Sequence, residues 1–420
     1  MPWREYSSNA AVLSVSAAIS ILAKNRRTPM NRESNIALAA RMAGIEPFRV
    51  MEVQNRAFEL EAQGRRIVHM EIGQPDFSAP PQVVEAAVDA LRNRSLGYTA
   101  ALGIPELREA IAGFYEERCG IRVSAERIIV TAGASGALML ALGAMVDPGD
   151  EWLMPDPCYP CNRHFVRMFE GRARAIAVDE RQAYQLSARD VRDNWTERAR
   201  GVLLASPSNP TGTTIAREEL RDIIAWVRSQ HGICIVDEIY FGLSYEGALR
   251  TALEFADDIF VVNSFSKYFS MTGWRLGWMV APQASVRNIE RLAQNAFICP
   301  SAPAQYAALA AFRPDTIALL EDRRLEFQRR RDFMVPALRE LGFTIPVTPT
   351  GAFYIYSGCE RFGPDSLDFA SRMLEQAGVA ITPGADFGSH RAERHVRFAY
   401  TRSIEELEDG VERIARLLRT

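Results

Sequence analysis

Seven short apolar runs between residues 127 and 281 constrain the fold of this chain more than any other feature. They alternate with amphipathic segments such as residues 217–231, whose apolar side chains recur at helical spacing. Strands that are apolar on both faces and separated by helices form a buried, mostly parallel sheet with helices on both sides. The runs are residues 127–133, 151–156, 173–178, 201–210, 232–238, 258–266 and 275–281. The sequence therefore predicts an α/β fold with a mostly parallel seven-stranded sheet.

The C-terminal hundred residues follow a different pattern, and 420 residues are too many for one ordinary core. We expect a large domain over 76–310 and a smaller α+β domain assembled from 30–75 and 311–420. The elements predicted for the smaller domain are helices at 33–63, 314–341 and 403–418 and β-like pieces at 351–356 and 394–400.

The first 29 residues form a predicted N-terminal extension. Residues 10–27 contain a short apolar stretch rich in Ala and Ser that is followed by basic residues, whereas a secretory signal has its basic residues first. We expect this extension to be disordered and Met30 to be the natural start. A transit-type peptide is the alternative.

The overall composition excludes several classes of protein. An apolar content of 48% and a charged content of 24% are typical of a soluble globular protein. A net charge of −3 gives no electrostatic reason to expect nucleic acid or an anionic membrane as partner, and no apolar run approaches the roughly 20 residues of a membrane span. Six sparse cysteines suit a cytoplasmic protein without disulfides or a metal site. A redox or zinc role for Cys158 and Cys161 is the minor alternative.

Polar residues follow three of the apolar runs at their C-terminal ends. Asn209 follows one run, Asp237 the next, and Ser264, Ser266 and Lys267 a third. In parallel sheets ligands collect outside the carboxyl ends of the strands, so these side chains are predicted to meet at one site.

Lys267 is unusual in this chain. The sequence has 49 basic residues, of which only Lys24 and Lys267 are lysine and the other 47 are arginine. An ammonium group loses its proton when it is desolvated or placed near other cations, whereas a guanidinium does not. The retention of lysine at position 267 therefore indicates that a primary amine is needed there as a nucleophile. The obvious use of such an amine is to form a Schiff base with a carbonyl compound. The alternative is an exposed lysine retained by chance.

From residue 40 to the end, the chain resembles the pyridoxal-phosphate-dependent aminotransferases of classes I and II. The resemblance rests on eight motifs in the order of that family. They are GQPDF (73–77), YTAALGIPELREAIA (98–112), VTAGASGAL (130–138), PDPCYP (155–160), SPSNPTG (206–212), VDEIY (236–240), SFSKYFSMTGWRLGW (264–278) and VRFAY (396–400). The resemblance implies the fold called type I of pyridoxal-phosphate enzymes, similar to aspartate and alanine aminotransferases.

The resemblance also implies how pyridoxal 5′-phosphate would be bound. Lys267 would form the Schiff base and be the catalytic residue. Asp237 would pair with the pyridine nitrogen; a helix N-cap is the minor alternative for this residue taken alone. Asn209 and Tyr240 would contact the phenolic oxygen, and Tyr159 would stack on the ring.

The phosphate group would be held by two segments. Gly133, Ala134 and Ser135 begin an apolar helix, whose free N–H groups favour an anion. The remaining donors implied by the resemblance are Ser264, Ser266 and Arg275. Tyr98 matches a residue that reaches the phosphate of a neighbouring subunit, which implies a homodimer with shared active sites.

The substrates implied are an L-amino acid and a 2-oxo acid. Arg397 would bind the α-carboxylate in a bidentate manner, with Gly73 and Asn209 also in contact with the substrate. The stretch 296–307 lacks a basic residue, which slightly favours small or apolar amino acids.

We predict a transaminase with ping-pong kinetics. β-Elimination, C–S bond cleavage and aminocyclopropane-carboxylate synthesis on the same scaffold are the alternatives, because the fold does not fix the fate of the substrate carbanion. A regulator without enzymatic activity is disfavoured, because the 29-residue N-terminal extension is too short for a DNA-binding module and lacks the pattern of a helix-turn-helix.

Overall fold

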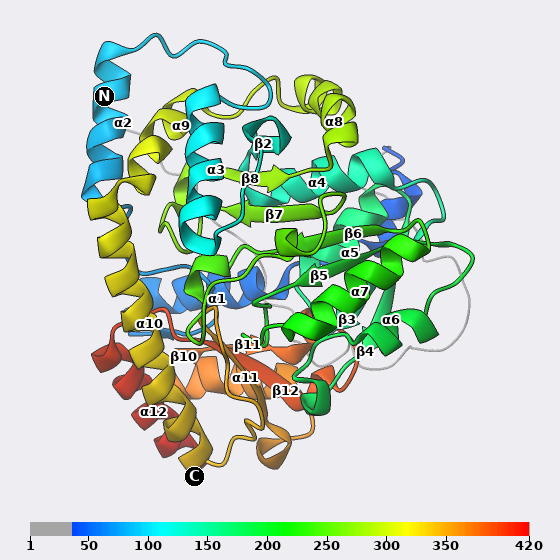
Figure 1. Cartoon of the computed structure of the whole chain (residues 1–420). Coiled ribbons are helices and arrows are strands. Elements are labelled where there is room, and N and C mark those ends of the chain that lie inside the picture. The colour runs from blue at the N-terminus through cyan, green and yellow to red at the C-terminus, as the bar shows by residue number, and fades with distance from the viewer. Residues whose placement is uncertain (1–35, 420) are drawn as a thin grey trace. The chain divides into compact units, whose positions relative to one another are not determined.

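The seven predicted runs form one seven-stranded sheet in the computed structural model, which describes residues 36–419 (Figure 1). The spatial order is β2-β8-β7-β6-β5-β3-β4. Strands β3 to β7 run parallel, and β8 is antiparallel to both of its neighbours. The strands are β2 Ile128–Thr131, β3 Glu151–Asp156, β4 Arg172–Ala177, β5 Ala199–Ala205, β6 Ile233–Asp237, β7 Phe260–Ser264 and β8 Gly277–Val280. The predicted fold class is confirmed.

Helices cover both faces of this sheet, which explains why its strands are mostly apolar, apart from the partly exposed edge strand β4. On β5, Val202 and Leu204 pack in the same cluster as side chains of α3 and α7, whereas Leu203 packs with α4, α5 and α8. Each such buried Val or Leu stabilises the fold by about 1.5–3 kcal/mol. Helix α7 lies in front of the sheet in Figure 1. The bounds of these helices are α3 Pro105–Cys119, α4 Gly133–Met145, α5 Pro160–Met168, α7 Arg217–Ser229 and α8 Gln283–Ala296.

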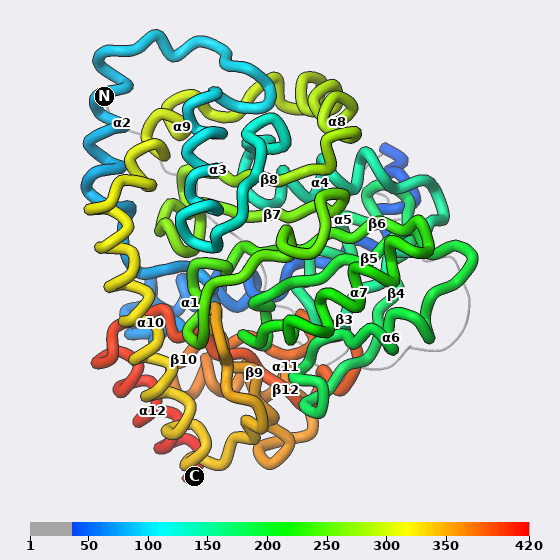
Figure 2. Tube along the Cα trace, viewed as in Figure 1, coloured from blue at the N-terminus to red at the C-terminus, as the bar shows by residue number. Residues whose placement is uncertain are grey.

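Two smaller sheets accompany the large one, and all of their strands except β1 come from the C-terminal part of the chain. One has the order β11-β12-β9, with both pairs antiparallel, and the other pairs β1 with β10 in parallel. These strands are β1 Val68–His69, β9 Tyr354–Gly358, β10 Val379–Ala380, β11 Thr382–Pro383 and β12 His395–Ala399. The long α10 packs side by side with α12 (Figure 2). The remaining helices are α1 Arg49–Ala62, α2 Pro81–Asn93, α6 Ala188–Asp193, α9 Ala302–Leu309, α10 Pro314–Glu340, α11 Ser366–Arg372 and α12 Ile404–Leu418.

One predicted helix differs from the structure. Instead of a single helix over 33–63, the described residues form a 3-10 turn at Ala40–Gly44 and then α1 at Arg49–Ala62. Pro47 lies between them, and a proline disfavours helical backbone at the residue before it. The helix that begins after Pro47 directs its first turn toward the site described below.

Several predictions about organisation stay untested. The predicted extension 1–29 lies outside the described residues. From Ala43 onward the chain forms one compact unit, so the predicted domain boundaries at 75/76 and 310/311 remain predictions. Within residues 36–419, every helix is too short or too polar to cross a membrane.

Candidate active site

A cavity of about 200 Å³ lies where the carboxyl ends of β5, β6 and β7 meet the C-terminal sheet. Twelve of the fourteen predicted site residues line it. They are Gly73, Ala134, Ser135, Tyr159, Asn209, Asp237, Tyr240, Ser264, Ser266, Lys267, Arg275 and Arg397. Gly133 and Tyr98 do not line the cavity.

Lys267 follows β7 and projects its amine into this cavity. Its Nζ donates a hydrogen bond to the carbonyl oxygen of Gly73 at 2.6 Å. Burial, followed by the positive charges of Arg397 and Arg275, lowers the pKa of Lys267 to about 8, and Asp237 opposes the shift. The structure thus gives this lysine the environment that the sequence analysis required, in which an ammonium group releases its proton near neutral pH.

Asp237 ends β6 and is 6% exposed. Its Oδ1 accepts a hydrogen bond from the backbone N–H of Ile239 at 3.0 Å, so the side chain closes a tight turn and does not cap a helix. Burial raises the pKa of Asp237 to about 6, against the opposing effects of this N–H and of Lys267. A carboxylate that is destabilised by burial in this way favours a cationic partner in the cavity.

Arg397 on β12 is 2% exposed and its guanidinium is held on several sides. Nη1 donates to Asn209 Oδ1 at 2.9 Å, and Nη2 donates to Thr382 Oγ1 at 3.1 Å and to the carbonyl oxygen of Glu71. Its Cζ lies 4.3 Å from the ring centre of Tyr354. Among the described residues, its buried Nε has no hydrogen-bond partner. The guanidinium is therefore rigidly placed and retains a donor for a ligand.

Three polar groups lie between Asp237 and Arg397. They are the hydroxyl groups of Tyr240 and Tyr354 and the side-chain amide of Asn209. The hydroxyl groups of Tyr240 and Tyr354 are 2.7 Å apart. Because arginine can only donate, the contact with Arg397 identifies the Asn209 atom facing it as the carbonyl oxygen, which leaves the amide nitrogen to donate elsewhere. This arrangement supplies donors to an oxygen atom of a bound ring.

The start of α4 and the lysine loop together form a concentration of anion-binding groups. The first N–H groups of a helix have no partner within the helix, and those of Ala134 and Ser135 border the cavity. Gly133 has a φ of 73°, and a Cβ there would lie 2.7 Å from Arg275 Nη2, which explains the glycine. The hydroxyl groups of Ser264 and Ser266, 3.0 Å apart, complete this part of the cavity.

Ten residues that the sequence analysis did not select also line the cavity. They are Phe48, Val50, Met51, Ile72, Leu138, Ala205, Pro207, Ile239, Thr272 and Tyr354. Most are apolar, and three belong to the start of α1 or precede it directly. Tyr354 lies in the predicted β-like piece 351–356, which is the only signal that the sequence analysis had for it.

Two predictions concern residues at the edge of this geometry. Tyr98 is 84% exposed and lies away from the cavity, as a residue directed at another subunit would. The ring of Tyr159 lines the cavity and meets Phe48 edge-on at 6.0 Å. Cys158 and Cys161 beside it are free thiols, and burial raises the pKa of both. Raised thiol pKa values disfavour redox or metal chemistry for this pair.

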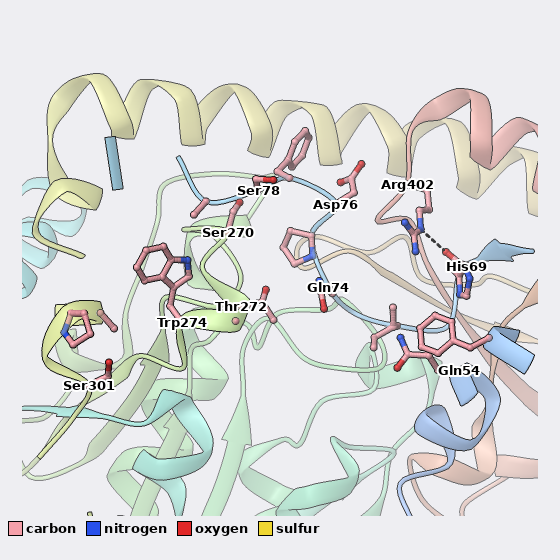
Figure 3. A pocket seen from close by; sticks show the side chains of 18 residues that line it. Gln54, His69, Gln74, Asp76, Ser78, Ser270, Thr272, Trp274, Ser301 and Arg402 are labelled. Carbon is pink, nitrogen blue, oxygen red and sulfur yellow. Dashed lines mark hydrogen bonds between the residues drawn. The ribbon is translucent and has the colours of Figure 1, made fainter. Parts of the chain in front are cut away.

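A second, larger recess of about 860 Å³ adjoins the cavity (Figure 3). Ile72 and Thr272 line both spaces, so the recess lies at the entrance to the cavity. Most of the lining residues that are labelled in Figure 3 are polar, and His69, Asp76 and Arg402 are among them.

Comparison with known proteins identifies one family. The family model described as aminotransferase class I and II matches residues 65–414. A valine–pyruvate aminotransferase of Mycobacterium tuberculosis is 39% identical over 374 residues, which cover 89% of this chain and 96% of that protein. A (5-formylfuran-3-yl)methyl phosphate transaminase of Methanocaldococcus jannaschii is 35% identical, over 91% of this chain and 99% of that protein. The crystal structure of an aminotransferase from Mycobacterium tuberculosis superimposes with a TM-score of 0.88 at 39% identity, over 91% of this chain and 99% of that one.

Proposed function

The chain belongs to the class I and II aminotransferases and is a transaminase, and from this premise we propose that it moves the α-amino group of an L-amino acid to a 2-oxo acid with pyridoxal 5′-phosphate bound at Lys267. One observation carries the proposal. A lysine whose pKa is lowered to about 8 shares a small cavity with a buried aspartate and a buried arginine. This is the set of groups that binding and deprotonating an amino acid requires.

The residues present fit the three chemical features of pyridoxal phosphate. The amine of Lys267 suits its aldehyde, the carboxyl group of Asp237 suits its ring nitrogen, and the donors at the start of α4 suit its phosphate. When bound, the cofactor supplies an electron sink that stabilises negative charge at the substrate Cα. The cavity has an excess of positive charge, because its three cationic residues Lys267, Arg275 and Arg397 outnumber the one carboxylate of Asp237. This excess complements two anionic groups, the cofactor phosphate and the substrate carboxylate.

Asp237 would hold a proton on the ring nitrogen. Its carboxyl group is buried, so a cation beside it restores the ionised form that burial disfavours. Tyr240 and the amide nitrogen of Asn209 would donate to the phenolic oxygen. Tyr159 would stack on the ring.

Lys267 would carry the proton between the substrate Cα and its acceptor. A pKa near 8 suits a group that must both take up and release a proton near neutral pH. Its hydrogen bond to the carbonyl oxygen of Gly73 gives the free amine a fixed position. Arg397 would bind the α-carboxylate, because it is desolvated and held in place by several acceptors.

The amino acid accepted is proposed to be small or apolar. Four of the residues that line the cavity, Phe48, Val50, Met51 and Ile239, offer apolar surface to a substrate side chain. The described cationic residues of the cavity are Lys267, Arg275 and Arg397, and all three have other roles. The relative that acts on valine and pyruvate is consistent with this substrate class.

Three further proposals concern the context of the enzyme. We propose that it is a homodimer with shared active sites, which the exposure of Tyr98 supports. We also propose two domains, a large one over 76–310 and a smaller one formed by 30–75 and 311–420. The proposed compartment is the cytoplasm, which the six free thiols support.

A half-reaction screen of the purified holoenzyme tests the proposal. Each amino acid is added without an oxo acid, and the visible absorption is followed for conversion of the cofactor to its aminated form. We expect valine, alanine or other apolar amino acids to convert it fastest and aspartate slowly. Release of ammonia with an unchanged cofactor form would instead support elimination.

A further inference from the structure

His69 and Glu71 form a buried charged pair beside the proposed carboxylate site. His69 Nδ1 lies 2.8 Å from Glu71 Oε1, and His69 Nε2 lies 3.2 Å from Glu61 Oε1 on α1. The Glu71 side chain has no exposed surface, and that of His69 is 10% exposed. Neither the sequence motifs nor the proposed reaction assigns a role to these three residues.

The contacts define the protonation state of His69. When both glutamates are ionised they only accept hydrogen bonds, so each ring nitrogen of His69 donates and the ring is an imidazolium. Burial alone lowers the pKa of His69, but hydrogen bonds and charge from Glu71 and then Glu61 raise it above 6.5 overall. The ring is therefore the counter-ion of a fully buried carboxylate.

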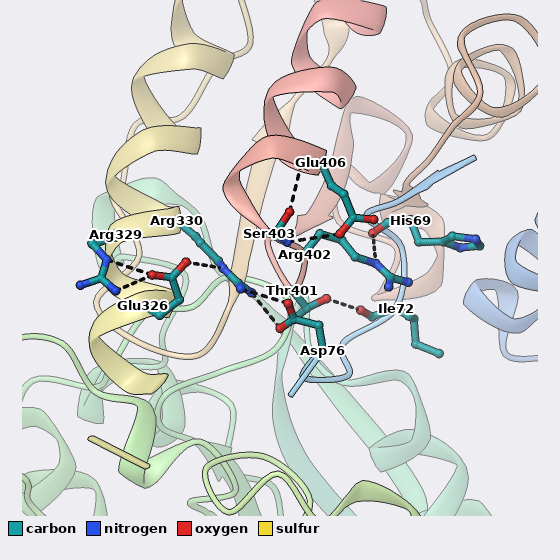
Figure 4. A network of polar contacts seen from close by, with 10 residues as sticks. All are labelled: His69, Ile72, Asp76, Glu326, Arg329, Arg330, Thr401, Arg402, Ser403 and Glu406. Atoms are coloured by element: carbon teal, nitrogen blue, oxygen red, sulfur yellow. Dashed lines mark hydrogen bonds and ion pairs between the residues drawn. The ribbon is translucent and has the colours of Figure 1, made fainter. Parts of the chain in front are cut away.

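Other groups around His69 do not replace this partner. Arg402 Nε donates to the backbone oxygen of His69 at 3.3 Å, not to Glu71 (Figure 4). Glu406 on α12 accepts from the backbone N–H of Ser403. On α1, the ring of Phe58 packs at 5.8 Å from the imidazole. Among the described residues, His69 is the cation hydrogen-bonded to Glu71.

The backbone of residues 69–73 connects this pair to the site, because five successive carbonyl oxygens accept hydrogen bonds. Glu71 O accepts from Arg397 Nη2, and Gly73 O accepts from Lys267 Nζ. The other donors are Arg402 Nε to His69 O, Ala399 N to Met70 O, Thr382 Oγ1 to Glu71 O and Thr401 Oγ1 to Ile72 O. The path of this segment thus sets where Arg397 and Lys267 point.

We propose that His69, as an imidazolium between Glu61 and Glu71, is a positioning residue that fixes segment 69–73 and through it makes carboxylate binding at Arg397 depend on pH. The inference rests on the proposed function, because it takes Arg397 as the partner of the substrate carboxylate. Loss of the proton leaves Glu71 buried without a counter-ion, a strongly unfavourable state that the segment relieves by moving. His69 lines the large recess of Figure 3, so it exchanges protons with solvent.

The direction of the pH effect follows from the raised pKa of His69. The stabilisation is complete below pH 6.5, the ordinary value, and is lost as pH rises through the value in the folded protein. Carboxylate affinity is therefore highest at acidic to neutral pH and falls above it.

The test uses 3-methylbutanoate, a carboxylate without an amine, binding to the holoenzyme by calorimetry between about pH 6 and 9. Proton NMR of the five histidines, assigned by substitution, gives the pKa of His69. We expect the wild-type affinity to fall about tenfold as pH passes this pKa. His69→Gln should bind more weakly at low pH and lack that step. His164→Gln, a half-buried histidine on α5, is the matched control and should behave as wild type.

Glu71→Gln is a second variant if His69→Gln fails to fold. It keeps the shape of the side chain but removes the buried charge, so it should reduce the pH step and lower the NMR pKa of His69. A wild-type affinity that is constant through the His69 titration, or a step that survives in His69→Gln, overturns the inference. Arg397→Lys distinguishes the proposed role of Arg397 from the proposed role of His69. Unchanged binding of 3-methylbutanoate in Arg397→Lys refutes the assignment of Arg397 to the carboxylate. Weakened binding in Arg397→Lys together with an unaltered pH step in His69→Gln refutes only the role of His69.

Discussion

Two of the three described cations of the cavity, Lys267 and Arg397, are held in opposite ways. Among the described residues, the Lys267 amine has one hydrogen bond, to Gly73 O, and its surroundings lower its pKa to about 8. Arg397 donates to several oxygen atoms and has an aromatic ring against its face. The lysine is arranged to give up its charge, and the arginine is arranged to keep its charge in one place. Reactivity and recognition thus require different environments for the same formal charge.

Replacement of Lys267 by arginine tests this difference most severely. Lys267→Arg keeps a cation but removes the amine, so turnover should fall by at least about 10³-fold. The lysine-bound absorption band of the cofactor should also be lost. Arg221→Lys, the reverse exchange at an exposed helix position, is the control and should leave activity unchanged. Substantial turnover in Lys267→Arg would show that positive charge is sufficient at this position.

The next prediction concerns Asp237, whose carboxylate we propose keeps the ring nitrogen of the cofactor in its cationic, protonated form. Asp237→Asn should lower kcat by about 10²-fold or more, because an uncharged amide does not keep the ring nitrogen protonated. In the cofactor-free protein, by contrast, the substitution should be favourable, because it should raise the stability of the fold near neutral pH. The pKa of Asp237 is raised from 3.8 to about 6, so its favourable contribution is present below pH 3.8 and lost as pH rises to about 6.

Thermal unfolding at several pH values measures this second effect. At pH 7 the cofactor-free Asp237→Asn protein should be more stable than wild type by roughly 1–3 kcal/mol. With cofactor bound the gain should disappear. A variant that is less stable than wild type without cofactor would contradict the assignment of Asp237 as a carboxylate kept for a cationic ligand.

Arg397→Lys tests the other side of the comparison. An ammonium group cannot bind a carboxylate in a bidentate manner and cannot make all the hydrogen bonds of the guanidinium to Asn209, Thr382 and Glu71, so KM for both substrates should rise roughly 10- to 100-fold. The cofactor absorption should stay normal, because Lys267 is intact. A fall in kcat without a change in KM would indicate that Arg397 acts on the cofactor and not on the substrate.

The lysine side of the site was predictable from sequence, and so was the large sheet. Both faces of most strands are buried, so most of the apolar runs are continuous and the polar residues after them are conspicuous. The edge strand β4, in which only Ile176 is buried, is the exception. The sequence alone therefore assigns Asp237 and Lys267 to one edge of one sheet. The predicted family is confirmed, and the family motifs also led to Arg397.

The surroundings of Arg397 were not predictable in the same way. Asn209 and Arg397 are 188 residues apart in sequence, and Glu71 and Arg397 are 326 apart. Contacts of this kind depend on how two sheets pack, which leaves no periodic signal in either segment. The start of α1, which brings Phe48 and Val50 to the cavity, and the pair of His69 and Glu71 were missed for the same reason.

The smallest predicted effect concerns Tyr354, which lies between the two cations. Its ring packs 4.3 Å from Arg397 Cζ, and its hydroxyl group is 2.7 Å from that of Tyr240. Tyr354→Phe keeps the ring and removes one hydrogen bond, a loss of about 0.5–1.5 kcal/mol. Since Tyr240 lies on the cofactor side, kcat should fall a few-fold and the absorption maximum should shift, whereas KM should stay within about twofold. A larger change in KM than in kcat would instead place the role of the Tyr354 hydroxyl group with Arg397.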